Sequence, residues 1–237
     1  MTSINQDHEE YAKATKRYLH AEYLKKYIKE PLKETLNPLL RDNGLLLLDP
    51  TNPLLLDPTH LVLPFIFTYI DLLGYLYKGK NSSSNAVEFM REYLGRIEPR
   101  YKEVGGLLYD ALRHGFVHLA TPKRIQLKNG IILDFSFAPV GKPQYHLSVT
   151  RREEIERGER LVICRLSVDL SRLYEDLLSA IDLYAQDICY NQELSEVFWK
   201  SFETRRKPEK AKEEVLLSKP YIQDSDFDFV REQISNL

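Results

Sequence analysis

The sequence LVLPFIFTYIDLLGYLYK, which spans Leu61 to Lys78, is the longest apolar stretch of the chain. It is apolar on nearly all sides of a helix, which is typical of a central helix packed on several sides. Pro64 and Asp71 interrupt it, and it falls short of the roughly 20 clean apolar residues that a membrane helix needs. We therefore expect it to be the core helix of a helical domain that does not associate with membranes.

Helical spacing of apolar residues predicts four further helices around this one. They run over about 9–36, 86–97, 104 or 106 to 118 or 119, and 169–190, with an extension of the last over 194–202. Pro122 ends the third of them. A short repeat, LLLDPT at 46–51 and again at 54–59, has too few units for a solenoid and is interpreted as a pair of Asp-Pro turns.

The pattern changes to strands after Pro122. The dipeptide Asn129-Gly130 predicts a hairpin turn between strands at 125–128 and 131–135, because both residues tolerate a positive φ angle. Two more strands are expected at 145–149 and 161–168, separated by a charged loop over 151–160. The expected class is mainly α (α+β), a helical bundle with a small antiparallel sheet inserted before the last long helix.

The sequence favours one domain over residues 1–237. Its helical core covers about 9–122 and 169–202, the β insertion about 123–168, and a flexible charged segment about 204–220.

Composition excludes several classes of protein. The 33 Lys and Arg residues against 35 Asp and Glu give a net charge of −2, so any site for a polyanion must be local. The chain lacks the P-loop, dinucleotide-binding, nucleophile-elbow and HExxH motifs, and we expect no cofactor. Its two cysteines, Cys164 and Cys189, lie far apart, which favours a cytoplasmic protein without a metal site. The first ten residues have neither a positive start nor an apolar core, so we expect no signal peptide.

The predicted helix around residue 113 carries the residues best suited to chemistry. At about 100° per residue, Asp110, Arg113, His114 and His118 share one polar arc, opposite a leucine-rich face. An imidazole can take a proton from a ribose 2′-hydroxyl or give one to a leaving 5′-oxygen, and a guanidinium can bind phosphate oxygens. The alternative is structural, a surface pair of Asp110 with Arg113 or His114.

The run Arg113-His114-Gly115-Phe116-Val117-His118 resembles the R-x4-6-H motif of the HEPN superfamily. The resemblance covers about residues 60–122 and not the predicted sheet. It implies a HEPN-like bundle with the motif in a late helix. Many HEPN proteins are metal-independent endoribonucleases of toxin–antitoxin, phage-defence and CRISPR systems, and act as homodimers. Some toxin members carry a Tyr two residues after this His, where the chain has Ala120, so that subgroup is not implied.

The resemblance also implies roles for these residues. Arg113 would bind the scissile phosphate, His118 would transfer protons or hold the ribose, and His114 would assist orientation, in a cleft shared by two copies. RNA and an antitoxin-like protein are then the expected partners. The alternative is a non-catalytic HEPN-like module that dimerises and binds RNA or protein.

Several nearby charged side chains are expected to support the site. Asp71 lies in an apolar helix and should be paired, either with Arg113 or His118 as an orienting residue, or elsewhere in the bundle. Asp110 is the second carboxylate expected to support the site. Lys123, Arg124 and Lys128 follow the motif and either line an RNA cleft or form the solvated edge of the hairpin.

Overall fold

The computed structural model describes residues 2–41, 58–116, 121–128, 130–138, 146–156 and 159–206. It confirms the expected class, because this part of the chain is mainly helical with one four-stranded sheet. The chain divides into two compact units, 1–202 and 203–237, and the second is described only at residues 203–206. The flexible segment predicted over 204–220 lies almost entirely outside the described residues.

The α-helices are α1 (Thr2–Leu24), α2 (Glu30–Arg41), α3 (Pro58–Lys78), α4 (Ser83–Phe89), α5 (Gly95–Ile97), α6 (Arg100–Leu108), α8 (Leu170–Tyr190) and α9 (Gln192–Arg206). Within the described residues, three π-helical turns continue or join them, η1 (Lys25–Lys29), η3 (Met90–Leu94) and η4 (Tyr109–His114). Each predicted helix is present, and most begin earlier than expected.

Local capping explains two of these starts. Ser82 caps α4, where its hydroxyl accepts the backbone N–H of Asn85 at 3.3 Å. Asp169 caps α8 by accepting the backbone N–H of Arg172 at 3.0 Å. A side-chain oxygen at this position satisfies a donor that the first helical turn leaves without a partner. Both caps therefore fix where a core helix begins.

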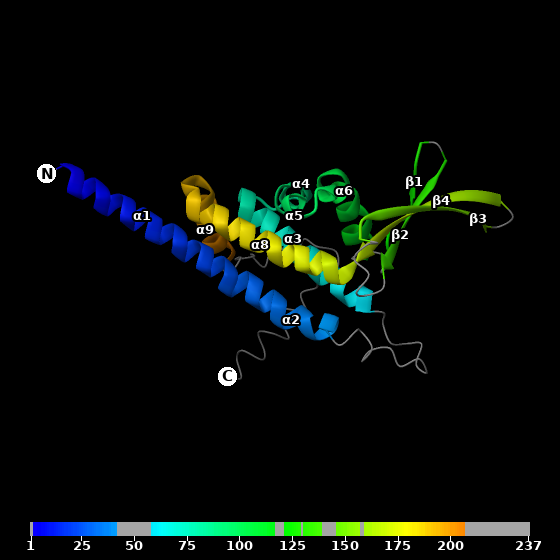
Figure 1. The fold of residues 1–237 in the computed structure, drawn as a ribbon, viewed down its shortest axis with the longest axis horizontal. Coiled ribbons are helices and arrows are strands. Elements are labelled where there is room, and N and C mark those ends of the chain that lie inside the picture. Colours follow the sequence, from blue (N-terminus) through cyan, green and yellow to red (C-terminus); the bar gives the residue numbers. More distant parts are fainter. Residues whose placement is uncertain are drawn as a thin grey trace, which may run out of the picture. The chain divides into compact units, whose positions relative to one another are not determined.

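The core of the first unit lies between α8 and the helices that pack on it. In Figure 1, α8 lies beside α1 for much of its length, and it also contacts α3 and η3. Within α3, residues Val62, Leu63, Ile66, Ile70 and Leu73 are wholly buried, as expected of the central helix. Gly74 allows α4 to approach closely, because a Cβ there would lie 2.5 Å from the backbone nitrogen of Ala86.

The sheet contains β1 (Ile125–Gln126), β2 (Ile132–Ala138), β3 (Ser148–Glu156) and β4 (Glu159–Asp169), and lies at the end of the bundle where α8 begins (Figure 1). Its order is β1-β2-β4-β3. β1 with β2 and β3 with β4 are antiparallel, as expected, and Gly130 adopts the positive φ of 77° predicted for the first turn. The pair of β2 with β4 is parallel, so the sheet is mixed and not wholly antiparallel.

The prediction of a charged loop over 151–160 is wrong. Residues 151–156 belong to β3 and 159–160 to β4, and the two strands pair from Ser148 with Ser167 to Glu156 with Glu159. The polar strand β3 takes the edge of the sheet, where charged side chains reach water, and the more apolar β4 takes the centre. β3 pairs with one side of β4, so β2 pairs with the other side, and this second pair is parallel.

Candidate functional site

The polar and apolar faces predicted around residue 113 are present in α6 and η4. Leu108, Tyr109, Leu112 and Phe116 are buried, and Ala111 joins them. On the other side Asp110 is exposed, while Arg113 and His114 are partly exposed. The backbone here is a π-helix from Tyr109 to His114, and such turns often occur at functional sites. The other two π-turns of the described chain also contribute buried side chains to the core, so a π-turn alone identifies no site.

Asp71 of α3 lies against this helix and holds two of its side chains. Arg113 Nε donates to Asp71 Oδ2 at 3.1 Å, and the Tyr109 hydroxyl donates to Asp71 Oδ1. Burial, and then this hydrogen bond, raise the pKa of Tyr109, so the phenol stays protonated and remains a donor. The sequence left Arg113 and His118 as alternative partners of Asp71. The structure contains the contact with Arg113. The orienting role assigned to Asp71 stays a prediction.

The guanidinium of Arg113 is fixed on one side and partly exposed. Its side chain is 28% exposed and that of Asp71 24%, so the pair lies at the surface of the bundle and not in its core. Within the described residues its only hydrogen bond uses Nε, and the two terminal nitrogens remain for a ligand. His114 packs edge-on against the ring of Tyr109, with centroids 5.6 Å apart. Tyr109 thus contacts His114 directly and shares the Asp71 carboxylate with Arg113.

Gly115 lets the chain fold back over the end of this helix. A Cβ at Gly115 would lie 2.5 Å from the carbonyl oxygen of Thr121 and 2.9 Å from the backbone nitrogen of Lys123. The backbone N–H of Lys123 donates to the carbonyl of Ala111 at 3.1 Å. The returning segment brings the Lys123 ammonium to 3.4 Å from Asp110.

The other two predicted RNA-binding cations lie along the hairpin. Arg124 is within 3.6 Å of Asp134 on β2, and that carboxylate also pairs with Arg165 of β4 at 3.3 Å. Lys128 is exposed in the turn between β1 and β2. Arg124 and Lys123 are thus each engaged with a carboxylate. The third motif residue, His118, lies outside the described residues.

A buried polar network joins the sheet to the helices, and sequence reasoning missed it. The backbone N–H of Asp169 donates to His146 Nδ1 at 3.1 Å, and His146 Nε2 lies 2.8 Å from the Tyr101 hydroxyl. That hydroxyl lies 3.2 Å from Asp176 Oδ2, and Arg172 Nε lies 2.9 Å from Asp176 Oδ1. His146 is almost wholly buried, with 2% of its surface exposed.

The contacts of this network fix its protons. Because Nδ1 of His146 accepts from a backbone N–H, the ring proton must lie on Nε2, which donates to Tyr101, and Tyr101 in turn donates to Asp176. Burial lowers the pKa of His146 to about 4, so the ring is neutral near pH 7. Burial raises the pKa of Asp176, and Arg172 opposes that rise. Every donor and acceptor named here is satisfied, which is the pattern of a structural network.

The described part of the chain contains neither a candidate metal centre nor a candidate membrane-spanning helix. Among those residues no three His, Cys, Asp or Glu side chains are grouped to hold a metal ion, and Cys164 and Cys189 are half-buried free thiols. No described helix is long and apolar enough to cross a membrane.

Comparison with known proteins identifies no relative. No family model matches the chain, and neither does a curated protein or a solved structure. The resemblance to the HEPN superfamily therefore stays a prediction, and any function must be argued from the residues themselves.

Proposed function

We propose that the face formed by Arg113, His114 and His118 binds RNA and cleaves it without a metal ion, as in a HEPN-like endoribonuclease. One observation carries this proposal. Asp71 holds Arg113 through Nε alone, at the surface, and no described residue accepts a hydrogen bond from its two terminal nitrogens. A guanidinium held in this way is preorganised to donate two hydrogen bonds to phosphate oxygens.

The chemistry that fits these residue types is an in-line transfer at phosphorus. A neutral imidazole takes the proton of the ribose 2′-hydroxyl, and that oxygen attacks the phosphorus. The bond to the 5′-oxygen breaks, and a protonated imidazole gives that oxygen its proton. The products are a 2′,3′-cyclic phosphate and a free 5′-hydroxyl. Arg113 stabilises the charge that grows on the phosphate oxygens, and His118 is assigned the proton transfers, with His114 assisting orientation.

A dimer belongs to this proposal, because one copy offers few cations for RNA. Lys123 and Arg124 are each engaged with a carboxylate, and the whole chain carries a charge of −2. Two copies that meet at this face would double the local positive charge. The same face would also be the surface that an antitoxin-like protein covers.

The engaged cations favour a second candidate, a module that dimerises and binds RNA or protein without cleaving it. The Asp71 carboxylate offsets the charge of Arg113, and Asp110 that of Lys123. In this alternative the polar arc supports contacts between proteins, and Arg113 to Asp71 is a structural pair. The two candidates differ only in whether a bond in RNA is broken.

The test is an RNA cleavage assay on the full chain, with and without EDTA. Arg113→Ala and His118→Ala should each lower the cleavage rate by about 100-fold or more, because each removes a group that acts in the transition state. Arg113→Lys, which keeps the charge and loses the planar fork, should restore only part of it. The exposed Arg91→Ala and His8→Ala serve as matched controls and should cleave at the wild-type rate.

Three outcomes would contradict the nuclease. Cleavage that survives both Arg113→Ala and His118→Ala would assign the activity to other residues or to a contaminant. Cleavage that EDTA abolishes would contradict the metal-independent step. Absence of cleavage from every RNA tested, with RNA retained by the wild type and lost by Arg113→Ala, would support the binding module instead.

A further inference from the structure

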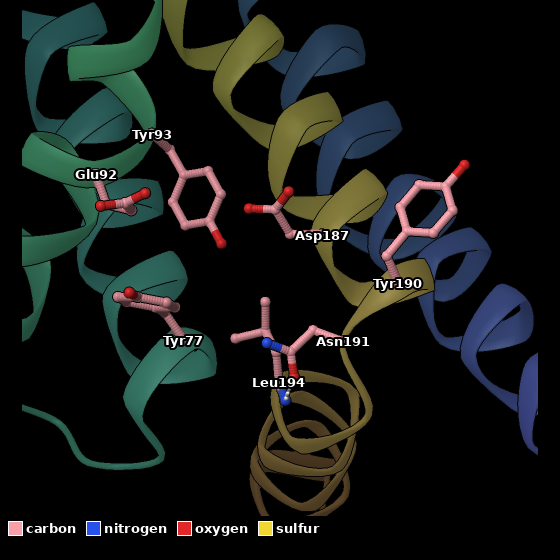
Figure 2. A pocket seen from close by; sticks show the side chains of 7 residues that line it. All are labelled: Tyr77, Glu92, Tyr93, Asp187, Tyr190, Asn191 and Leu194. Carbon is pink, nitrogen blue, oxygen red and sulfur yellow. Dashed lines mark hydrogen bonds between the residues drawn. The ribbon is translucent and has the colours of Figure 1, made fainter.

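A pocket of about 350 Å³ lies where three helices of the first unit end or begin (Figure 2). Its lining comes from the end of α3, from η3, from the last turn of α8 and from the start of α9. The lining residues are Tyr77, Glu92, Tyr93, Asp187, Tyr190, Asn191 and Leu194. Figure 2 shows Tyr93 and Asp187 pointing toward one another, while Tyr190 turns outward. The volume is at the lower end of the range for small-molecule sites.

Two tyrosines form an aromatic corner at this pocket. The rings of Tyr77 and Tyr93 are 5.5 Å apart and almost perpendicular, at 87°. The chain places its own cations near both rings. Lys78 Nζ lies 4.4 Å from the centre of the Tyr77 ring, and the guanidinium carbon of Arg96 lies 5.6 Å from the centre of the Tyr93 ring. Such distances are typical of cation–π attraction, so these rings present electron-rich faces that favour positive charge.

The charge of the pocket is negative. Arg96 pairs with Asp187 at 2.6 Å, whereas Glu92 is exposed and makes no ion pair within the described chain. Burial, followed by the Asp187 carboxylate, raises the pKa of Tyr93, so its hydroxyl stays neutral and polar. Glu92, Asp187 and Arg96 leave one net negative charge at the pocket, and the charge of Lys78 beside Tyr77 is offset by its ion pair with Glu88.

Two helix ends add to this negative potential. Both α3 and α8 finish at the pocket, near Tyr77 and Tyr190, and the C-terminal end of a helix carries partial negative charge. The last turn of α8 has no basic residue, whereas Lys78 in the last turn of α3 offsets part of the negative charge of that helix end. The opposite effect of the α9 start is reduced, because the Asn191 side chain accepts the backbone N–H of Leu194 at 3.0 Å and Glu193 lies in the first turn.

A polar atom without a partner lies in the same aromatic cluster. Tyr184 is fully buried and contacts both Tyr93 and Tyr77, with ring centres 5.1 and 6.0 Å away. Its hydroxyl makes no hydrogen bond with any described residue. A buried hydroxyl without a hydrogen-bond partner destabilises the fold, and its oxygen adds a further dipole behind the rings of Tyr77 and Tyr93.

We propose that this pocket binds a small organic cation through its ammonium group. The Tyr77 ring supplies the cation–π contact, since Tyr93 is only 1% exposed. Glu92 supplies the countercharge, and the two helix ends favour the same sign. An anion would meet repulsion from Glu92, from the Tyr77 face and from the helix ends. A metal ion would find few ligands, because Arg96 already engages Asp187. The site is independent of the RNA-cleaving face proposed above, and each can fail without the other.

The test is a titration of the full chain followed by amide NMR, at constant ionic strength. The probes are choline, putrescine and 3,3-dimethylbutan-1-ol, which has the shape of choline without the charge. Choline or putrescine should shift the amide signals around Glu92 and Asp187 in a saturable way, and the neutral alcohol should not. Choline alone would specify a quaternary ammonium, and putrescine alone a primary one.

Variants separate this site from general attraction to an acidic surface. Glu92→Gln should weaken binding at least 5-fold, and Tyr77→Leu should abolish it in protein that keeps its folded spectrum. The control is Glu175→Gln, an exposed carboxylate on α8 outside the pocket, which should bind as the wild type does. Equal shifts from choline and the alcohol, or equal weakening by Glu92→Gln and Glu175→Gln, would overturn the proposal. Tighter binding of Nα-acetyl-lysine N-methylamide than of either free cation would assign the pocket to a peptide partner and also overturn it.

Discussion

At the scale of single residues, the described chain uses polar side chains where two elements meet. Asp71 holds α3 to η4 through Arg113 and Tyr109, and His146 holds the sheet to α6 through Tyr101. The first group is partly exposed and retains donors for a ligand, whereas the second is buried and satisfied. Because of this contrast, we assign His146 a structural role and propose a functional role for Arg113.

Replacement of Gly115 should destabilise the protein by about 1–3 kcal/mol. In Gly115→Ala the new methyl group would overlap the backbone of Thr121 and Lys123. That backbone cannot move away without breaking the hydrogen bond from Lys123 N–H to the carbonyl of Ala111. Urea unfolding measures the change. Gly106→Ala is the control, because a methyl group there makes only ordinary contacts and alanine favours a helix; it should leave the free energy of unfolding unchanged or raise it. Equal effects of the two substitutions would contradict the close approach.

His146 should make stability depend on pH. Its pKa is about 4 in the folded protein and 6.5 ordinarily, so between these values the unfolded chain binds the extra proton. Its contribution is fully present above about pH 6.5 and is lost as the pH falls toward 4, by about 3 kcal/mol. His146→Gln removes this titration, so the difference in free energy of unfolding between wild type and variant should shrink from pH 7 to pH 4. A difference that stays constant would show that the ring is not held neutral.

At the scale of elements, the position of each strand follows from its polarity. β4 contains Leu161, Val162, Ile163 and Leu166 and lies in the middle of the sheet, with β2 on one side and β3 on the other. β3 is mostly charged and forms an edge, where Arg152 and Glu154 pair along one face. β4 ends at Asp169, and the same residue is the buried N-cap of α8. One residue therefore joins the sheet to this core helix of the bundle.

Loss of the cap at Asp169 should cost about 1 kcal/mol or more. Asp169→Ala removes the oxygen that accepts the N–H of Arg172, whereas Asp169→Asn keeps an acceptor in the same position. Thermal and urea unfolding should therefore show a clear loss for the alanine variant and a small one for the asparagine variant. Comparable losses for both would mean that the charge of Asp169, and not the cap, stabilises α8.

At the scale of the whole molecule, charge restricts how RNA would be held under the proposed function. A chain with a net charge of −2 has no general attraction for a polyanion, so the proposed binding must come from the face around Arg113. Carboxylates already engage two of the nearby cations. Any grip on RNA is then local and depends on few contacts.

RNA binding, where the proposed function holds, should be weak and sensitive to salt. With about two or three phosphate contacts, log K should fall with log salt at a slope of about −1.4 to −2 for a single strand. Fluorescence anisotropy from 50 to 300 mM NaCl measures this slope. Arg113→Ala should reduce its magnitude, and Arg91→Ala should leave it unchanged. Binding that persists at high salt would contradict a site built from these few cations.

The sequence by itself determined the features that depend on neighbours along the chain. The apolar run at 61–78 gave a buried helix, Asn129-Gly130 gave a turn, and the spacing around Arg113 separated a core face from a polar face. Periodicity and turn chemistry act over a few residues, so they can be read without the fold. The π-turn at 109–114 changes the backbone locally without changing which residues are buried, and no signal in the sequence predicts it.

The tertiary structure alone decided the contacts between distant residues. Asp71 and Arg113 are 42 positions apart, and Tyr101 and His146 are 45 apart, so nothing local selects these partners over others. The parallel pairing of β2 with β4 likewise joins strands that are not neighbours in the sequence, so no local pattern specifies it. The pocket at Tyr77 requires three helix ends to converge. Packing of the core chooses among such pairings, because many are equally compatible with the local pattern but only one set buries the apolar faces and satisfies the polar groups together.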